Sequence, residues 1–185
     1  HTLLGEHAKI KLAPDFTSLV EADISNKLYD KVKDGVCLIP NARMTDKTSD
    51  EVAGKYMEYL IAVGSSILKR EEKLILLNHE AEGDWDLIEA IKERLTEKQN
   101  VLALNNLDAY QVKAVIGHCK LLISSRFHGV VSGLNQSIPT FCTSWSHKYE
   151  ELLADYKLHE NLLDPLKPNE AIRRRSEERR VGKEC

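Results

Sequence analysis

The sequence has 185 residues, of which 42% are hydrophobic and 30% are charged, and its formal net charge is −3. This composition is typical of one globular domain, and the small negative charge provides no field that would attract a nucleic acid. Because no apolar run approaches the roughly 20 residues that a membrane-spanning helix needs, we expect no transmembrane segment.

The first 35 residues show no regular alternation of strand and helix signals. They contain an apolar run that Pro14 interrupts, followed by a polar stretch from 21 to 34. The chain begins with His1, which is not a natural start, and we therefore expect it to be a fragment of a longer protein.

From Val36 onward, short apolar runs alternate with amphipathic stretches. The runs predicted to be strands are 36–39, 74–77, 101–104, 121–123 and 139–143. Strands that are apolar on both faces are typical of a parallel sheet covered by helices on both sides. The pattern therefore predicts a Rossmann-like α/β domain over residues 36–174.

The stretches between these runs carry helix start signals. Thr48 and Glu51 have the spacing of a capping box, Asp84 is placed to cap the next helix, and Asp108 with Gln111 has capping-box spacing again. Apolar residues follow each cap at helical spacing, which predicts one buried face for each helix. A last helix is expected from about 147 to 156.

The cysteines predict no disulfide or metal site. Cys37, Cys119, Cys142 and Cys185 show no C-x-x-C spacing, and the first three lie in or beside apolar runs. We expect those three to be reduced, packed thiols, as in a cytoplasmic protein, and we predict no metal site.

The fourth apolar run leads into the most informative stretch of the chain. It ends in Ser124 and Ser125, and Arg126 and His128 then open an amphipathic segment. A strand that feeds a helix here would place free backbone N–H groups and the positive helix end beside an arginine, at the carboxyl edge of the sheet. The sequence therefore predicts an anion site in which the guanidinium of Arg126 binds phosphate or carboxylate. The alternative is that Arg126 pairs with a neighbouring carboxylate of the protein.

Other candidate residues follow the ends of neighbouring strands. Arg43 follows the first strand and His79 follows the second, so both are expected at the same edge of the sheet. Each has a plainer interpretation. Arg43 is equally compatible with a solvent-exposed side chain, and His79 with a capping or core histidine.

Three segments together resemble the C-terminal half of the polysaccharide pyruvyltransferase family. They are SRFHG at 125–129, IPT at 138–140 and WSHKY at 145–149, and the similarity extends back to 36–47. The resemblance implies that residues 36–174 form the C-terminal, donor-binding domain of a two-domain glycosyltransferase-B-like fold. Residues 1–35 would then close the N-terminal domain and form the interdomain linker.

The resemblance also implies an activity. It implies transfer of a pyruvyl group from phosphoenolpyruvate to saccharide hydroxyls of a polysaccharide or its precursor, which forms a ketal and needs no cofactor. It gives anion binding to Arg126 and Arg43, and it favours His128 as a general acid or base over a purely structural histidine. Its WSHKY segment adds His147 and Lys148 as substrate-binding candidates, whose alternative is a pair of charges at a helix start. His79 is a further substrate-binding candidate.

We expect the chain alone to be inactive, because closure of two domains is expected to bring acceptor and donor together. Two other functions remain open at this point. One is a glycosyltransferase that uses a nucleotide sugar, and the other is a non-catalytic sugar-binding domain, because one fold can support all three. Binding of phosphoenolpyruvate against nucleotide diphosphates would discriminate between the two enzymes.

Residues 175–185, RSEERRVGKEC, have no periodicity. They resemble the translation of a sequencing-adapter oligonucleotide, and we expect them to be a foreign scar that plays no part in the fold. The alternative is an ordinary charged, solvated terminus.

Overall fold

The computed structural model describes residues 16–23, 25–80, 82–170 and 173. Its centre is a five-stranded parallel sheet with the strand order β3-β2-β1-β4-β5. The strands are β1 (Val36–Ile39), β2 (Leu74–Leu77), β3 (Val101–Leu104), β4 (Leu121–Ser124) and β5 (Thr140–Cys142). All the predicted strands are confirmed, and β1, β2 and β3 have the predicted bounds.

The central strand shows why the sheet needs a helix layer on each side. Every residue of β1 is buried. Val36 and Leu38 belong to one hydrophobic cluster, whereas Cys37 and Ile39 belong to another, because successive side chains of a strand point to opposite faces. Both faces are therefore apolar, and the predicted Rossmann-like α/β fold is confirmed.

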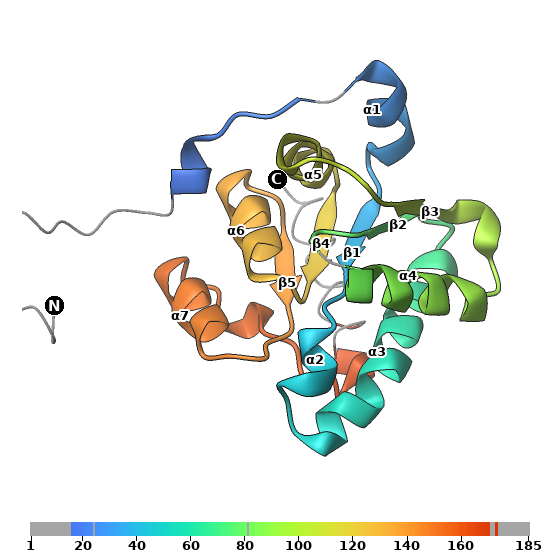
Figure 1. Ribbon diagram of the computed structural model, residues 1–185, viewed down its shortest axis with the longest axis vertical. Coiled ribbons are helices and arrows are strands. Elements are labelled where there is room, and N and C mark those ends of the chain that lie inside the picture. Colours follow the sequence, from blue (N-terminus) through green and yellow to red (C-terminus); the bar gives the residue numbers. More distant parts are fainter. Residues whose placement is uncertain (1–15, 24, 81, 171–172, 174–185) are drawn as a thin grey trace, which may run out of the picture.

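The helices divide between the two faces of the sheet (Figure 1). Helices α3 (Asp50–Leu68) and α4 (Glu82–Arg94) pack on one face, and α5 (Ala109–Gly117) and α6 (Phe127–Asn135) pack on the other. The remaining elements are η1 (Phe16–Leu19), α1 (Asn26–Val32), α2 (Arg43–Asp46), η2 (Lys98–Asn100), α7 (Lys148–Asp155) and η3 (His159–Asn161).

The helix starts confirm one predicted cap and correct two. Asp108 caps α5 in the predicted capping box with Gln111. The prediction of a capping box formed by Thr48 and Glu51 was wrong. The hydroxyl of Thr48 donates to the carbonyl of Met44 at 2.6 Å, and Ser49 caps α3 instead. Asp84 is not a cap either, because α4 begins at Glu82 and the Asp84 carboxylate is fully buried.

The described residues also test the predictions for the cysteines and for membrane-spanning helices. Cys37, Cys119 and Cys142 are buried free thiols, as predicted. No helix in the described ranges is long and apolar enough to cross a membrane. The predictions for residues 1–15 and for the tail at 175–185 lie outside the described residues, and the division into domains stays a prediction.

Helix α6 approaches the sheet closely through two glycines one turn apart. A Cβ atom at Gly129 would lie 2.7 Å from Oγ of Ser124, and one at Gly133 would lie 2.6 Å from Cδ2 of Leu122. Real Cβ atoms do not approach other atoms so closely, so only glycine fits at both positions. The glycines therefore fix the height of α6, and with it the position of His128, above the sheet.

We expect Gly133→Ala to lower the free energy of unfolding by about 1–3 kcal/mol, because the added methyl group overpacks the contact with β4 and β5. Gly54→Ala is the matched control. Gly54 is an exposed residue inside α3 with no atom within 4 Å of its added Cβ, and this change should stabilise by about 0.5–1 kcal/mol. Urea unfolding followed by circular dichroism measures both; equal stabilities for the two variants would contradict the close approach of α6.

Candidate functional site

The site lies where the order of the strands reverses. From β1 the chain proceeds outward to β2 and β3, and it then returns to the other side of β1 to add β4 and β5. In open parallel sheets, ligands bind outside the carboxyl ends of the strands at such a switch point. Here Asn41 follows β1 and Ser125 follows β4, and Nδ2 of Asn41 donates to the carbonyl of Ser125 at 2.8 Å.

A buried hydrogen-bond network around Ser125 forms the floor of the site. The Tyr56 hydroxyl donates to Oγ of Ser125 at 2.6 Å, and the Tyr149 hydroxyl donates to the Ser125 carbonyl at 2.7 Å. Oγ of Ser125 also shares a hydrogen bond of 2.7 Å with Oγ1 of Thr143, which follows β5. Burial raises the pKa of both tyrosines, so both remain hydrogen-bond donors. The network holds the ends of β4 and β5 against α3 and α7.

A cavity of about 230 Å³, called the edge pocket below, opens at this end of the sheet. Side chains from the ends of several strands and from the starts of α6 and α7 converge on it. They are Asn41, His79, Glu80, Arg126, Phe127, His128, Trp145, Ser146, Lys148 and Tyr149.

Arg126 pairs with two carboxylates. Its Nε donates to Oδ2 of Asp84 at 2.6 Å, and its Nη1 pairs with Oε2 of Glu80. Burial lowers the pKa of Arg126, but the hydrogen bond to Asp84 and the charges of Asp84 and Glu80 outweigh this effect and raise it. The ion pair named as the alternative for Arg126 is therefore present, and binding of an external anion stays a prediction.

The two carboxylates differ in a way that matters for a ligand. Asp84 is fully buried and also accepts a hydrogen bond from the backbone N–H of Ala42 at 2.8 Å, whereas the side chain of Glu80 is 63% exposed. Glu80 can therefore turn into solvent at little cost, because an exposed ion pair contributes little stability. Within the described residues, Nη2 of Arg126 makes no hydrogen bond, and Arg126 lines the edge pocket, so Nη2 keeps its donors for a ligand.

The two histidines of the edge pocket have different environments. Burial lowers the pKa of His79 to about 4; the charge of Glu80 opposes this shift, and those of Arg126 and His128 add to it. His79 is therefore neutral at pH 7, and its Nδ1 is buried with no hydrogen-bond partner in the described ranges. His128 is the second residue of α6, in the first helical turn as predicted, and it is exposed.

The remaining predicted site residues are distributed unequally. Lys148, the first residue of α7, lines the edge pocket. Arg43 lines an adjoining cavity of about 410 Å³, together with Glu80 and Arg126. The Arg43 side chain is 52% exposed and pairs with Asp46 at 2.9 Å. His147 is exposed and lines neither cavity.

Sequence reasoning missed the acidic part of the site. Asp84 was interpreted as a helix cap, and Glu80 was not selected, although it directly follows His79. The signal that points to both is the presence of carboxylates just after a strand end where two arginines are also expected, since buried charges need partners.

A model of the family described as polysaccharide pyruvyl transferase matches residues 2–147. The chain belongs to the polysaccharide pyruvyl transferase family. This match covers all of the segments 125–129 and 138–140 on which the resemblance was based, together with the loop that follows β1. A search of curated proteins finds no match.

Two solved structures are similar to this family member in fold. One is described as a UDP-N-acetylglucosamine 2-epimerase from Listeria monocytogenes, with 14% identity, a TM-score of 0.48, and coverage of 66% of this chain and 32% of that chain. The other is Methanocaldococcus jannaschii UDP-GlcNAc 2-epimerase in complex with UDP-GlcNAc and UDP, with 8% identity, a TM-score of 0.48, and coverage of 68% and 34%. The chain spans about a third of the length of these structures. Similarity at this level does not transfer their activity to it.

We expect Asp84→Ala to lower the free energy of unfolding by about 3 kcal/mol, because it leaves the Arg126 guanidinium and the Ala42 N–H without their buried partner. Asp86→Ala is the matched control on the same helix, where the side chain is exposed, and it should change stability by less than about 0.5 kcal/mol. Thermal and urea unfolding of both variants check this. A loss no larger for Asp84 than for Asp86 would show that the buried carboxylate does not hold the site together.

Proposed function

We propose that this domain binds phosphoenolpyruvate and supports transfer of its pyruvyl group to two hydroxyls of a saccharide, which forms a ketal. The observation that carries the proposal is the position of Arg126. It lies at the start of α6, one edge of its guanidinium is fixed by Asp84, and it lines the edge pocket beside His128. Membership of the polysaccharide pyruvyl transferase family supports the same reaction.

The edge pocket has the groups that a small, multiply charged anion needs. Phosphoenolpyruvate carries a phosphate and a carboxylate, and Arg126 and Lys148 provide cationic groups for them. No side chain caps α6, so the N–H groups of its first turn and its positive dipole end are directed toward the same place. Glu80 is the exposed counter-ion that the ligand would displace from Arg126, and Arg43 in the adjoining cavity would add a further positive charge.

The reaction balances without a cofactor. The enol methylene carbon of phosphoenolpyruvate takes a proton and becomes a methyl group, and the neighbouring carbon forms two bonds to the oxygens of two sugar hydroxyls. The bond between that carbon and the phosphate oxygen breaks, and the phosphate leaves with the second of the two hydroxyl protons. Cationic groups would stabilise the departing phosphate, and a residue that moves protons is needed near the reacting carbon.

His128 suits the proton transfers better than His79. A histidine with a pKa of about 4, as burial gives His79, carries almost no proton at neutral pH. His128 is exposed in the first turn of α6 and lines the same pocket. We therefore assign general acid or base catalysis to His128 and a hydrogen-bonding role in substrate binding to the neutral His79.

The buried thiols at Cys37, Cys119 and Cys142 support the predicted cytoplasmic location.

We expect Arg126→Lys to weaken binding of phosphoenolpyruvate by about ten- to a hundredfold, because lysine keeps the charge but loses the planar set of donors. Arg94→Lys at the exposed end of α4 is the matched control and should bind like the wild type. Calorimetric titration of the wild type and both variants measures their affinity for phosphoenolpyruvate, and their affinity for UDP is measured for comparison. Wild-type affinity in Arg126→Lys would remove Arg126 from the donor site, and tight binding of UDP alone would favour a nucleotide-sugar glycosyltransferase.

We expect His128→Gln to leave binding of phosphoenolpyruvate nearly unchanged and to lower pyruvyl transfer by roughly 10²–10⁴-fold, the usual contribution of general acid–base catalysis. Transfer is measured in the full-length protein, as release of phosphate and formation of the ketal methyl signal by NMR. Full transfer by His128→Gln would show that this histidine has only a structural role.

A further inference from the structure

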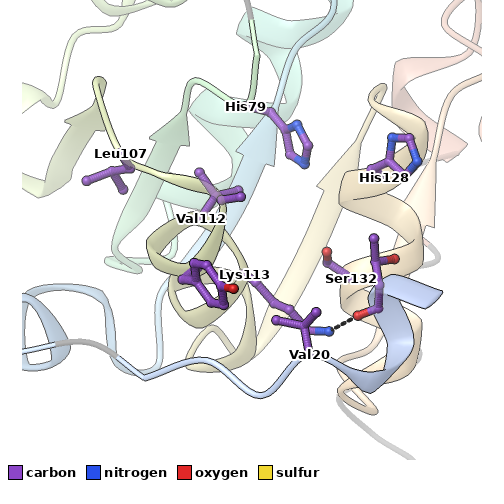
Figure 2. A pocket seen from close by; sticks show the side chains of 10 residues that line it. Val20, His79, Leu107, Val112, Lys113, His128 and Ser132 are labelled. Carbon is purple, nitrogen blue, oxygen red and sulfur yellow. Dashed lines mark hydrogen bonds between the residues drawn. The ribbon is translucent and has the colours of Figure 1, made fainter. Parts of the chain in front are cut away.

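A second and larger cavity, of about 520 Å³, adjoins the edge pocket. It lies between α5 and α6 and is called the helix cavity below (Figure 2). His79 and His128 line both cavities, so the two share one boundary. Figure 2 shows these histidines at one end of the helix cavity and Lys113 and Val20 at the other.

The helix cavity has the walls of a ligand site. Leu107, Val112 and Val20 make it largely apolar, and Thr17 and Ser132 contribute hydroxyls. Tyr110, in the first turn of α5, also lines it and is 62% exposed, which is unusual for so large an aromatic side chain. Apolar walls with a few polar groups and an aromatic side chain are typical of sites that bind small organic molecules.

Lys113 is the observation that points to a polar ligand. It is only 7% exposed, and its Nζ donates to the carbonyl of Thr17 at 2.5 Å. An ammonium group has three N–H donors, and this is the one hydrogen bond that the described part of the chain gives it. Because a buried charge is costly unless its donors are satisfied, oxygen atoms of a ligand in the cavity would complete its coordination.

We propose that the helix cavity binds a sugar ring of the acceptor. The proposal rests on the proposed pyruvyl transfer to a saccharide. A sugar ring has a face of C–H groups, which packs on an aromatic ring such as Tyr110, and an edge of hydroxyls, which accept from Lys113. A ring held in this way between Lys113 and the two histidines would present its other hydroxyls to the edge pocket, where the donor carbon is expected.

The shared histidines explain why this place suits the acceptor. Ketal formation needs two sugar oxygens at one carbon of the donor, so the acceptor and the donor must meet in adjacent sites. His128 faces both cavities and can exchange a proton with either substrate, and the neutral His79 can hydrogen-bond a sugar hydroxyl.

The test is a titration of the isotopically labelled chain with the methyl glycosides of galactose, glucose, mannose and N-acetylglucosamine, followed by NMR. At least one glycoside should bind at millimolar concentration and shift the signals of Tyr110, Lys113 and Ser132. Tyr110→Ala should weaken this binding by about tenfold, the size expected from loss of one aromatic contact, and Tyr110→Phe should keep it. Tyr156→Ala, at another exposed tyrosine, should also keep it.

The outcomes separate this inference from the donor assignment. No shift with any of the four glycosides, or equal glycoside binding by the wild type and Tyr110→Ala, would overturn the acceptor site. Shifts with uridine and with none of the glycosides would overturn it as well, because the cavity would then bind a nucleoside. Phosphoenolpyruvate is titrated into the same samples and should bind equally well to Tyr110→Ala. If a glycoside binds through Tyr110 and phosphoenolpyruvate does not bind, the acceptor site stands and the proposed donor fails.

Discussion

The carboxylate of Asp84 is the constraint on which the site depends. It is fully buried, and its two oxygens accept hydrogen bonds from the backbone of Ala42, after β1, and from the guanidinium of Arg126, after β4. A buried carboxylate is stable only when it is paired, so the start of α4 is tied to both sides of the switch point. The same pairing fixes Nε of the guanidinium, while Nη1 pairs with the exposed Glu80. Under the proposed function, structural support and anion recognition would therefore depend on the same pair of residues.

The sequence was sufficient to predict the architecture and the edge of the sheet at which most of the candidate residues gather. The strands are short runs of apolar residues between helix start signals, and the parallel topology then places Arg126, His79 and Lys148 at one edge. The features that the sequence did not predict, the burial of Asp84 and its pairing with Arg126, depend on tertiary contacts. Asp84 has the residue type and position of a cap, and a local preference cannot show that the carboxylate is instead buried against a strand end 42 residues away. The choice between anion binding and an ion pair for Arg126 depended on the same unseen contact.

The adjacent residues His147 and Lys148 show a second limit of sequence reasoning. Both match the same family segment, yet only Lys148 lines the edge pocket. Neighbouring residues at a helix start project in different directions, so the sequence match alone cannot show which of the two side chains lines the pocket. The two histidines of the pocket make a related point, because burial separates the neutral His79 from the exposed His128 although the residue type is the same.

The close packing of α6 on the sheet limits how that side of the site can adapt to a ligand. At Gly129 and Gly133 the helix backbone packs directly on side chains of β4 and β5, so the helix start and His128 have no room to move toward the sheet. Adaptation to differently shaped molecules must then come from the opposite wall, where Glu80 is exposed. A designed inhibitor should therefore match the α6 side closely in shape and charge, and its variable groups belong on the side of Glu80.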